Sequence, residues 1–245
     1  MVTDEELQAA RRPRDVVDVA GSWIAGALAT HGFHWLARTR TVQRQAGSLL
    51  HQIALHPSSY NRTDRLVSVS TYVGVRDPAF RRWRLAHPHL VAPPRDHDFV
   101  CGHLLGYASG RANGYLYGDA QDGDIDLTEP AERAKRLKRF VAMLEEGVLP
   151  WFTEASDPDL IVNSRAGDYT NNPVALMEWL AYQDRIDLVH SYAERYQARH
   201  PGTEQRWTHG AAAATAGRMS PHGGDTAAAM GWCATILTAN PTGSG

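Results

Sequence analysis

The sequence predicts an α+β protein: an antiparallel meander sheet of four to six strands flanked by two helices, followed by an all-helical C-terminal module. Three patterns predict this class. Apolar residues repeat at helical spacing over residues 14–31 and after residue 128, they alternate at strand spacing between residues 33 and 117, and helical patterns alone follow residue 172. We therefore expect an α+β domain over residues 1–160 and a helical module of two helical hairpins over residues 161–245.

The first flanking helix is predicted over residues 14–31. Val16, Ala20, Ile24 and Ala27 share one helix face, and charged side chains occupy the other. Gly32 follows directly, and glycine is the residue that most readily takes the left-handed conformation closing a helix.

Two long strands are predicted over residues 48–56 and 66–75, where one face is apolar and the other largely polar. Shorter strand-like runs occupy residues 33–36, 41–45, 103–109 and 114–118, with turn residues between them. Such alternation is typical of an antiparallel sheet that is covered on one side. The polar face offers candidate binding residues: Gln52, His56, Ser68, Ser70 and Tyr72.

The second flanking helix is predicted to begin at Thr128, because threonine caps free amides and the nearby Pro130 tolerates the first helical position. Residues 149–152, Leu149 to Phe152, are expected to end it, and the polar residues 163–172 are expected to form a linker. Four further helices are predicted: after Asn172, over residues 188–200, over residues 203–217 and from Asp225 onward.

Bulk composition indicates a soluble protein of a bacterial cytoplasm. Two cysteines, Cys101 and Cys233, cannot form a disulfide framework. The N-terminus is acidic and does not show the basic, then apolar, then small-residue order of a signal peptide. The longest apolar segment, residues 227–237, is too short for a membrane span, so no membrane partner is expected. With 25 basic and 27 acidic residues, the charge is balanced, and nothing global suggests a nucleic-acid partner.

Several short segments of the first 155 residues match a known pattern: Gly32–Phe33, residues 40–44, the strand over residues 49–56 with Ser58 after it, the strand end at Val75, and residues 105–106, 115–117 and 149–152. On these segments, residues 14–155 resemble an uncharacterised bacterial family, the domain of unknown function 4304. The resemblance implies a helix, sheet, helix arrangement and brings no known activity and no catalytic residue. The chain departs from the pattern at Leu55–Pro57 and in the long connection over residues 76–100.

Four histidines, two aspartates and Cys101 gather within residues 87–103. Zinc binds His, Cys, Asp and Glu, so this cluster is a candidate metal site, with His97, Cys101 and His103 as the ligands. The spacing matches neither a helical histidine pair nor a cysteine knuckle, and three prolines stiffen the segment toward extended structure. We therefore expect an inter-strand recognition loop without a cofactor, and zinc is the alternative.

Arg81, Arg82, Trp83 and Arg84 combine cations with an aromatic ring in the same segment. In a protein of balanced charge this combination favours a solvated loop or a protein contact over a nucleic-acid groove. The four residues are therefore candidate binding residues. The aspartates over residues 119–126 do not have the ligand order of an EF-hand calcium loop. Carboxylates are favoured near the start of a helix, so the helix that follows accounts for them without a calcium ion.

The sequence contains no phosphate-binding glycine loop, no nucleophile elbow and no dinucleotide fingerprint. We therefore predict a non-catalytic binding protein that recognises a protein partner through the sheet face and the loop over residues 76–100, an immunity-type protein being one version. Two alternatives stay open. One is a metal-assisted or hydrolytic enzyme centred on residues 87–103, with His56 as acid or base, and the other is a small-molecule carrier with a cleft between the two modules.

Overall fold

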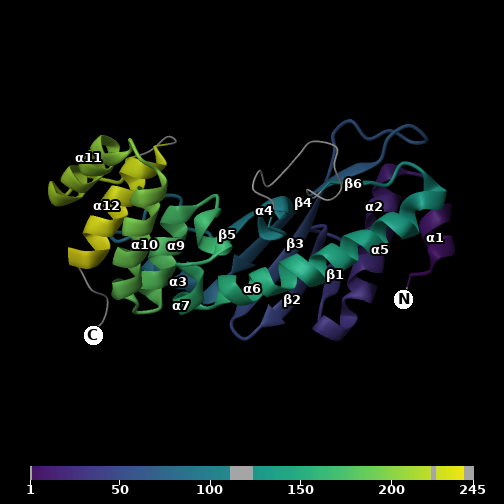
Figure 1. Ribbon diagram of the computed structural model, residues 1–245, viewed down its shortest axis with the longest axis horizontal. Helices are drawn as coiled ribbons and strands as arrows, with labels where there is room; N and C mark the ends of the chain where they lie inside the picture. Colours follow the sequence, from purple (N-terminus) through teal and green to yellow (C-terminus); the bar gives the residue numbers. More distant parts are fainter. Residues whose placement is uncertain (1, 111–123, 222–224, 240–245) are drawn as a thin grey trace. The chain divides into compact units, whose positions relative to one another are not determined.

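The protein has the predicted α+β fold with an open antiparallel sheet. A computed structural model describes residues 2–110, 124–221 and 225–239. Five strands lie in sequence order across the sheet, and a sixth, β6 (Asp124–Asp126), pairs with the first residues of β4 (Figure 1). The five are β1 (His34–Leu36), β2 (Thr41–Ala46), β3 (Leu49–Pro57), β4 (Ser68–Arg76) and β5 (Phe99–Leu104). This order confirms the predicted meander.

The chain divides into two compact units. The sheet unit comprises Met1–Val75 and Gly102–Thr153, and the helical unit comprises Arg76–Cys101 and Glu154–Gly245. The segment between β4 and β5, residues 77–98, therefore groups with the C-terminal helices. Among the described residues, no helix is long and apolar enough to cross a membrane.

Strand alternation sets the two faces of the sheet. Along β3, the side chains of Leu49, His51, Ile53 and Leu55 are buried, and those between them are more exposed. The register with β2 places Val42 opposite Ile53, so that the apolar side chains of both strands fall on one face. This is the pattern from which the strands were predicted.

Helices cover the apolar face of the sheet unit. Helix α2 (Pro13–Ala27) packs on β1, β2 and β3, and α5 (Arg133–Met143) packs on α1 (Asp4–Ala9), α2 and β6 (Figure 1). The buried guanidinium of Arg133 donates to the carbonyl oxygens of Leu7 and Ala10 at 2.8 Å and of Leu127 at 2.7 Å. It thereby satisfies carbonyl groups at the end of α1 that lack partners within that helix.

The prediction that residues 149–152 end the second flanking helix was wrong. The helix changes register in a π-helical turn, Leu144–Val148, and continues as α6 (Leu149–Ser156). A proline inside an α-helix removes one donor and crowds the carbonyl four residues earlier, and a π-turn adds one residue where that crowding would occur. The bulge therefore lets the chain remain helical through Pro150.

The expectation of an irregular loop over residues 76–100 was also wrong. This segment contains helix α3 (Pro78–Ala86), which begins at Asp77. The Asp77 carboxylate accepts from the amides of Ala79 at 2.9 Å and Phe80 at 3.2 Å, and proline occupies the first helical position. The Asp–Pro pair is a local signal for a helix start that the sequence analysis passed over.

Two smaller differences concern strand and linker positions. The strand expected over residues 103–109 is shifted, since β5 ends at Leu104 and a short helix, α4 (Leu105–Ala108), follows. The expected linker over residues 163–172 contains α8 (Arg165–Asp168), and α7 (Pro158–Ile161) precedes it. The strand expected over residues 114–118 and most of the aspartate run over residues 119–126 lie outside the described residues.

Four helices form the C-terminal bundle of the helical unit: α9 (Pro173–Tyr182), α10 (Ile186–Arg199), α11 (Glu204–Thr215) and α12 (Thr226–Ala239). Asn172 caps α9 as predicted, because its side chain accepts from the Ala175 amide at 3.1 Å. Helices α11 and α12 approach so closely that a Cβ atom at Gly210 or Gly231 would overlap the backbone carbonyl of Ala228 or Trp207. Glycine at these two positions permits the approach.

His51 lies in the core of the sheet unit. Its ring stacks on Phe152 with centroids 4.4 Å apart, and Arg44 donates to its Nδ1 atom at 3.0 Å. Burial first, and the charge of Arg44 second, lower the pKa of His51 to about 4. The folded protein therefore holds this imidazole neutral at a pH where the unfolded chain protonates it.

We expect His51 to make the sheet unit acid-sensitive. Because the folded-state pKa lies below the unfolded value near 6.5, its contribution is complete above pH 6.5 and is lost as the pH falls to about 4, by roughly 3 kcal/mol. Urea unfolding at pH 7.5 and pH 4.5 measures this loss. His51→Gln should show a smaller loss, and an equal loss in both proteins would contradict the assignment.

Candidate functional site

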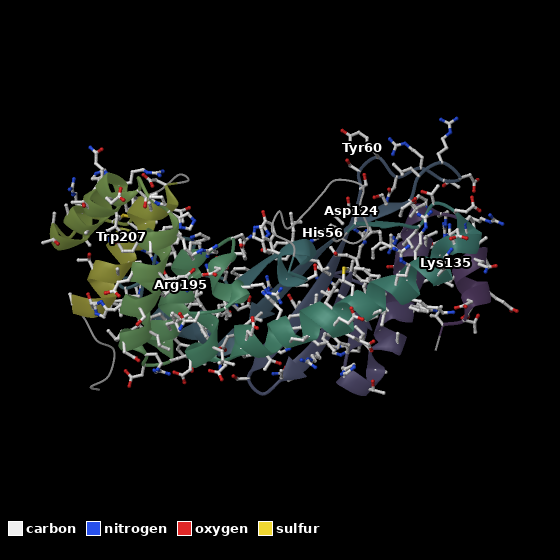
Figure 2. The ribbon with its side chains drawn as sticks, viewed as in Figure 1. His56, Tyr60, Asp124, Lys135, Arg195 and Trp207 are labelled. Carbon is white, nitrogen blue, oxygen red and sulfur yellow. The ribbon has the colours of Figure 1, made fainter. Side chains whose placement is uncertain are left out.

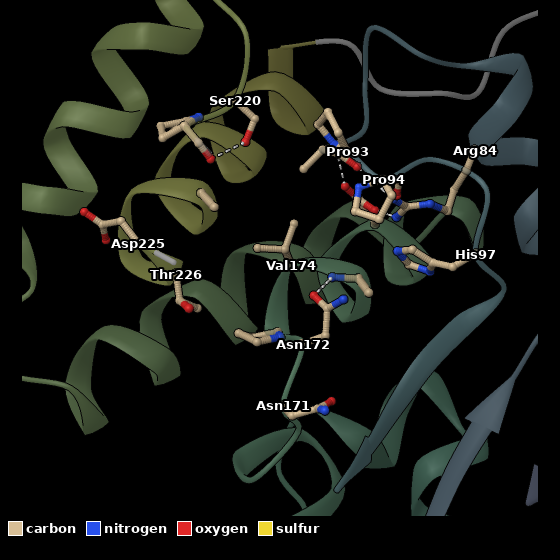
Figure 3. Close-up of a pocket in the computed structure, with 16 residues that line it drawn as sticks. Arg84, Pro93, Pro94, His97, Asn171, Asn172, Val174, Ser220, Asp225 and Thr226 are labelled. Carbon is tan, nitrogen blue, oxygen red and sulfur yellow. Dashed lines mark hydrogen bonds and ion pairs between the residues drawn. The ribbon is translucent and has the colours of Figure 1, made fainter. Parts of the chain in front are cut away.

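A pocket of about 190 Å³ lies within the helical unit (Figure 3). Three parts of the chain line it: the end of α3 with residues 92–97, the start of α9 with Asn171 and Asn172, and the start of α12 with Ser220 and Pro221. Most of its exposed lining is polar, with apolar patches at Pro93, Val174 and Ala229. Since concave sites with a few convergent polar groups commonly hold ligands, this pocket is the candidate site.

A buried ion pair between Arg84 and Glu178 forms one wall of the pocket. The two side chains are 1% and 0% exposed. Arg84 Nη2 also donates to the carbonyl oxygens of Ala92 at 2.8 Å and Pro94 at 2.7 Å, and Glu178 Oε1 accepts from the Ala92 amide at 2.7 Å. Burial lowers the pKa of Arg84 to about 10, so the guanidinium remains charged at neutral pH.

A second buried contact fixes the start of α3 against α9. Asp77 is 1% exposed, and its Oδ2 atom accepts from Trp179 Nε1 at 3.3 Å, while Oδ1 caps α3. Trp83 and Tyr182 add an aromatic contact with ring centroids 6.0 Å apart. These contacts hold α3, the helix that carries Arg84, against α9 at both of its ends.

His97 lies beside Arg84 in the pocket wall (Figure 3). Burial first, and the charge of Arg84 second, lower its pKa to about 4. Its Nδ1 atom is buried and has no hydrogen-bond partner among the described residues, and the same holds for Arg84 Nε. Both atoms have almost no accessible surface, so a molecule in the pocket would not touch them without a rearrangement.

Helices α9 and α12 both begin at the pocket. Asn172 and Val174 line it from α9, and Asp225 and Thr226 line it from α12. Asp225 accepts from the Ala228 amide at 3.1 Å and faces Arg206 at 3.9 Å. The free amides at a helix start carry partial positive charge, and two starts therefore contribute to the same site.

The three candidate zinc ligands have different surroundings. His97 lines the pocket, Cys101 is buried without a disulfide, and the ring of His103 lies 4.0 Å from Tyr107. His103 Nδ1 accepts from the Leu104 amide at 2.8 Å. Within the part of the chain that the structure describes, no group of three or more His, Cys, Asp or Glu residues could hold a metal ion.

The candidate residues of the polar sheet face lie together on β3 and β4. His56 is exposed (Figure 2), and its ring meets Tyr72 edge-on at 6.5 Å. Ser70 Oγ donates to the His56 carbonyl at 3.4 Å, Gln52 donates to Gln43 at 2.6 Å, and the Ser68 backbone pairs with Asn61. Their role in binding stays a prediction.

The four candidates on α3 separate into exposed and buried side chains. Arg81 and Arg82 are exposed, and Arg81 Nε donates to the Asp96 carbonyl at 2.6 Å. Trp83 is half-buried and stacks on His87 with centroids 4.9 Å apart. Arg84 is not the surface cation that the sequence suggested, because its guanidinium lies in the core ion pair with Glu178.

Sequence reasoning missed most of the pocket. Glu178 stands in an otherwise apolar helix, Pro173–Tyr182, and an isolated carboxylate among buried residues is a signal for a buried partner. Asn172 and Asp225 were recognised as helix starts only. Nothing in the sequence indicates that the two starts meet.

Comparison with known proteins finds no match among family models, curated proteins or solved structures. The resemblance to the domain of unknown function 4304 therefore stays a prediction.

Breaking the ion pair should destabilise the helical unit. Glu178→Gln leaves the Arg84 charge buried without its counter-charge, and we expect the free energy of unfolding to fall by about 3–5 kcal/mol. The double variant Arg84→Met/Glu178→Leu should recover most of that loss. Urea unfolding followed by tryptophan fluorescence measures both.

Arg82→Met, on the exposed side of α3, is the matched control and should change stability by less than about 0.5 kcal/mol. If E178Q is as stable as this control, the pair does not hold the unit together.

Proposed function

We propose that this chain is a binding protein that holds a small polar molecule in the pocket of the helical unit. One observation carries the proposal. Polar groups from three parts of the chain converge on one concave space of about 190 Å³, among them His97, Asn172 and Asp225. A small molecule that hydrogen-bonds to such groups would be held in a fixed orientation.

The fixed wall of the pocket supports binding. Arg84 is held by one ion pair and two carbonyl groups, so the wall that it supports does not depend on a ligand. Preorganised polar groups favour affinity because little side-chain entropy remains to be lost. The predicted carrier with a cleft between two modules stays a separate prediction.

Filling the pocket should abolish binding. In Figure 3 the Val174 side chain points into the space between the walls, and Val174→Phe would occupy it. Fragments of about six to ten non-hydrogen atoms, screened by ligand-observed NMR, should bind the unaltered protein and not V174F.

The matched control is Ala198→Phe, which adds the same ring to an exposed position of α10. It should leave fragment binding unchanged. A screen without binders, or binders that V174F retains, would reject the pocket as the site.

A protein partner is the second candidate, and the exposed face of α3 supports it. Arg81 and Arg82 are exposed there, and Leu85 is 51% exposed. Arginine beside an exposed apolar side chain is typical of interaction surfaces. An immunity-type complex with a toxin is one version of this proposal.

Reversing the charge of this face should abolish a protein complex. Affinity purification from the native cell should recover a stoichiometric partner with the unaltered chain and lose it with Arg81→Glu/Leu85→Glu. The exposed Tyr60, on the β3–β4 connection, offers a control position as Tyr60→Glu (Figure 2). Recovery of the same partner with the α3 variant would rule this face out.

A further inference from the structure

We infer that one end of the sheet unit is an interaction surface for an acidic segment of a partner protein. The inference goes beyond the proposed pocket and the face of α3, because both of those lie in the helical unit. We call this surface the arginine end. It comprises the α1–α2 junction, the β1–β2 turn and the β3–β4 connection, which carry five exposed arginines: Arg11, Arg38, Arg40, Arg62 and Arg65.

Strand pairing places two of these three segments at the same end of the sheet. Leu36 pairs with Thr41, and Thr41 pairs with Ala54, so the β1–β2 turn lies beside the last residues of β3. The Leu55 amide donates to the Arg40 carbonyl at 2.8 Å, which continues this register. The β3–β4 connection leaves the sheet at the same end, because it follows β3 directly (Figure 1).

Hydrogen bonds bring the α1–α2 junction to this end as well. The buried Arg133 donates to the carbonyl of Ala10, the neighbour of Arg11, and to the carbonyl of Leu127. The Leu127 amide in turn donates at 2.7 Å to the carbonyl of Val67, where the β3–β4 connection ends. The junction and the connection therefore meet through Arg133 and Leu127.

The β3–β4 connection has a fixed conformation. Asn61 exchanges two hydrogen bonds with the Ser68 backbone, Nδ2 donating at 2.9 Å and Oδ1 accepting at 2.8 Å. The backbones of Arg62 and Leu66 bond to each other in both directions, at 2.9 and 3.1 Å. Arg62 Nη1 also donates to the carbonyls of Ser59 at 3.2 Å and Asn61 at 2.8 Å. Because the connection is already ordered, a partner that binds here would cost it little conformational entropy.

The positive charges of the arginine end are only partly compensated. Within the part of the chain that the structure describes, none of the five arginines forms an ion pair. The nearby carboxylates of Asp15, Asp18 and Asp126 pair with other arginines. Asp64 and Glu129 are the neighbouring carboxylates that no described cation pairs, so an excess of positive charge remains. A partner rich in carboxylates would supply the missing counter-charges, and guanidinium groups bind carboxylates through two parallel hydrogen bonds.

Exposed apolar groups at the arginine end favour a protein over a nucleic acid as the partner. Tyr60 is 73% exposed (Figure 2), and Leu66 is 37% exposed. Tyrosine and arginine are enriched among the side chains that dominate protein interfaces, and apolar area beside them adds burial. A nucleic-acid surface needs a continuous stripe of cations, and Asp64 and Glu129 interrupt this one.

The test titrates the full chain with three probes at pH 7.5, followed by protein NMR. They are a soluble peptide that repeats Glu-Glu-Leu-Gly, the same peptide with glutamine in place of glutamate, and an oligothymidylate of similar length. The glutamate peptide should bind about tenfold more tightly than the glutamine peptide, and the amide signals of Arg40, Arg62 and Arg65 should shift. Raising the NaCl concentration from about 50 to about 300 mM should weaken the glutamate peptide about fivefold.

Arg40→Glu/Arg65→Glu tests whether these charges are responsible. Neither side chain forms a hydrogen bond or ion pair among the described residues, so the variant should fold, and it should bind the glutamate peptide about tenfold more weakly. The matched control is Arg165→Glu/Arg218→Glu, which makes the same change of net charge at exposed positions of the helical unit and should leave peptide binding unchanged.

The remaining outcomes each decide the inference. Equal binding of the two peptides, or retention of the glutamate peptide by R40E/R65E, would overturn it. Tighter binding of the oligothymidylate would assign the surface to nucleic acid, and a dimer at low salt that R40E/R65E abolishes would make the occupant a second copy of this chain. If no probe binds, the inference fails, and the pocket and the face of α3 stand or fall by their own tests.

Discussion

The helical unit depends on the buried ion pair between Arg84 and Glu178. Through it, helix α3, the residues around Ala92 and Pro94, and helix α9 meet at one point. Burying two charges removes their hydration, and their mutual attraction compensates only when the remaining polar atoms are also satisfied. Here the Ala92 and Pro94 carbonyls and the Ala92 amide satisfy most of them. The pair therefore joins the segment between β4 and β5 to helix α9.

The same network defines the candidate site. Because Arg84 is fixed by its partners, the pocket wall carries a charged donor whose orientation does not depend on a ligand. The Arg84 and His97 side chains both line the pocket, while Arg84 Nε and His97 Nδ1 are buried. Arg84 therefore belongs both to the structural ion pair and to the lining of the candidate pocket.

In the sheet unit, strand alternation decides which side chains are buried. Alternation along β3 places Ile53 in the core and Gln52 on the opposite, polar face, and helices α2 and α5 cover the apolar side. The exception is His51, which takes a core position and is accommodated by Phe152 and Arg44. A titratable group in the core makes the stability of this unit depend on pH.

The sequence by itself determined the fold class, the meander order, the two flanking helices and the capped start of α9. Each of these follows from local periodicity or a local capping signal, as at Gly32 and Asn172. Only the tertiary structure decided the shift of β5, the helix through Pro150, the burial of Arg84 and the pocket itself. Arg84 and Glu178 are 94 residues apart in the chain. The sequence shows that a residue is charged, but only long-range packing decides whether that charge is hydrated or is buried beside a partner.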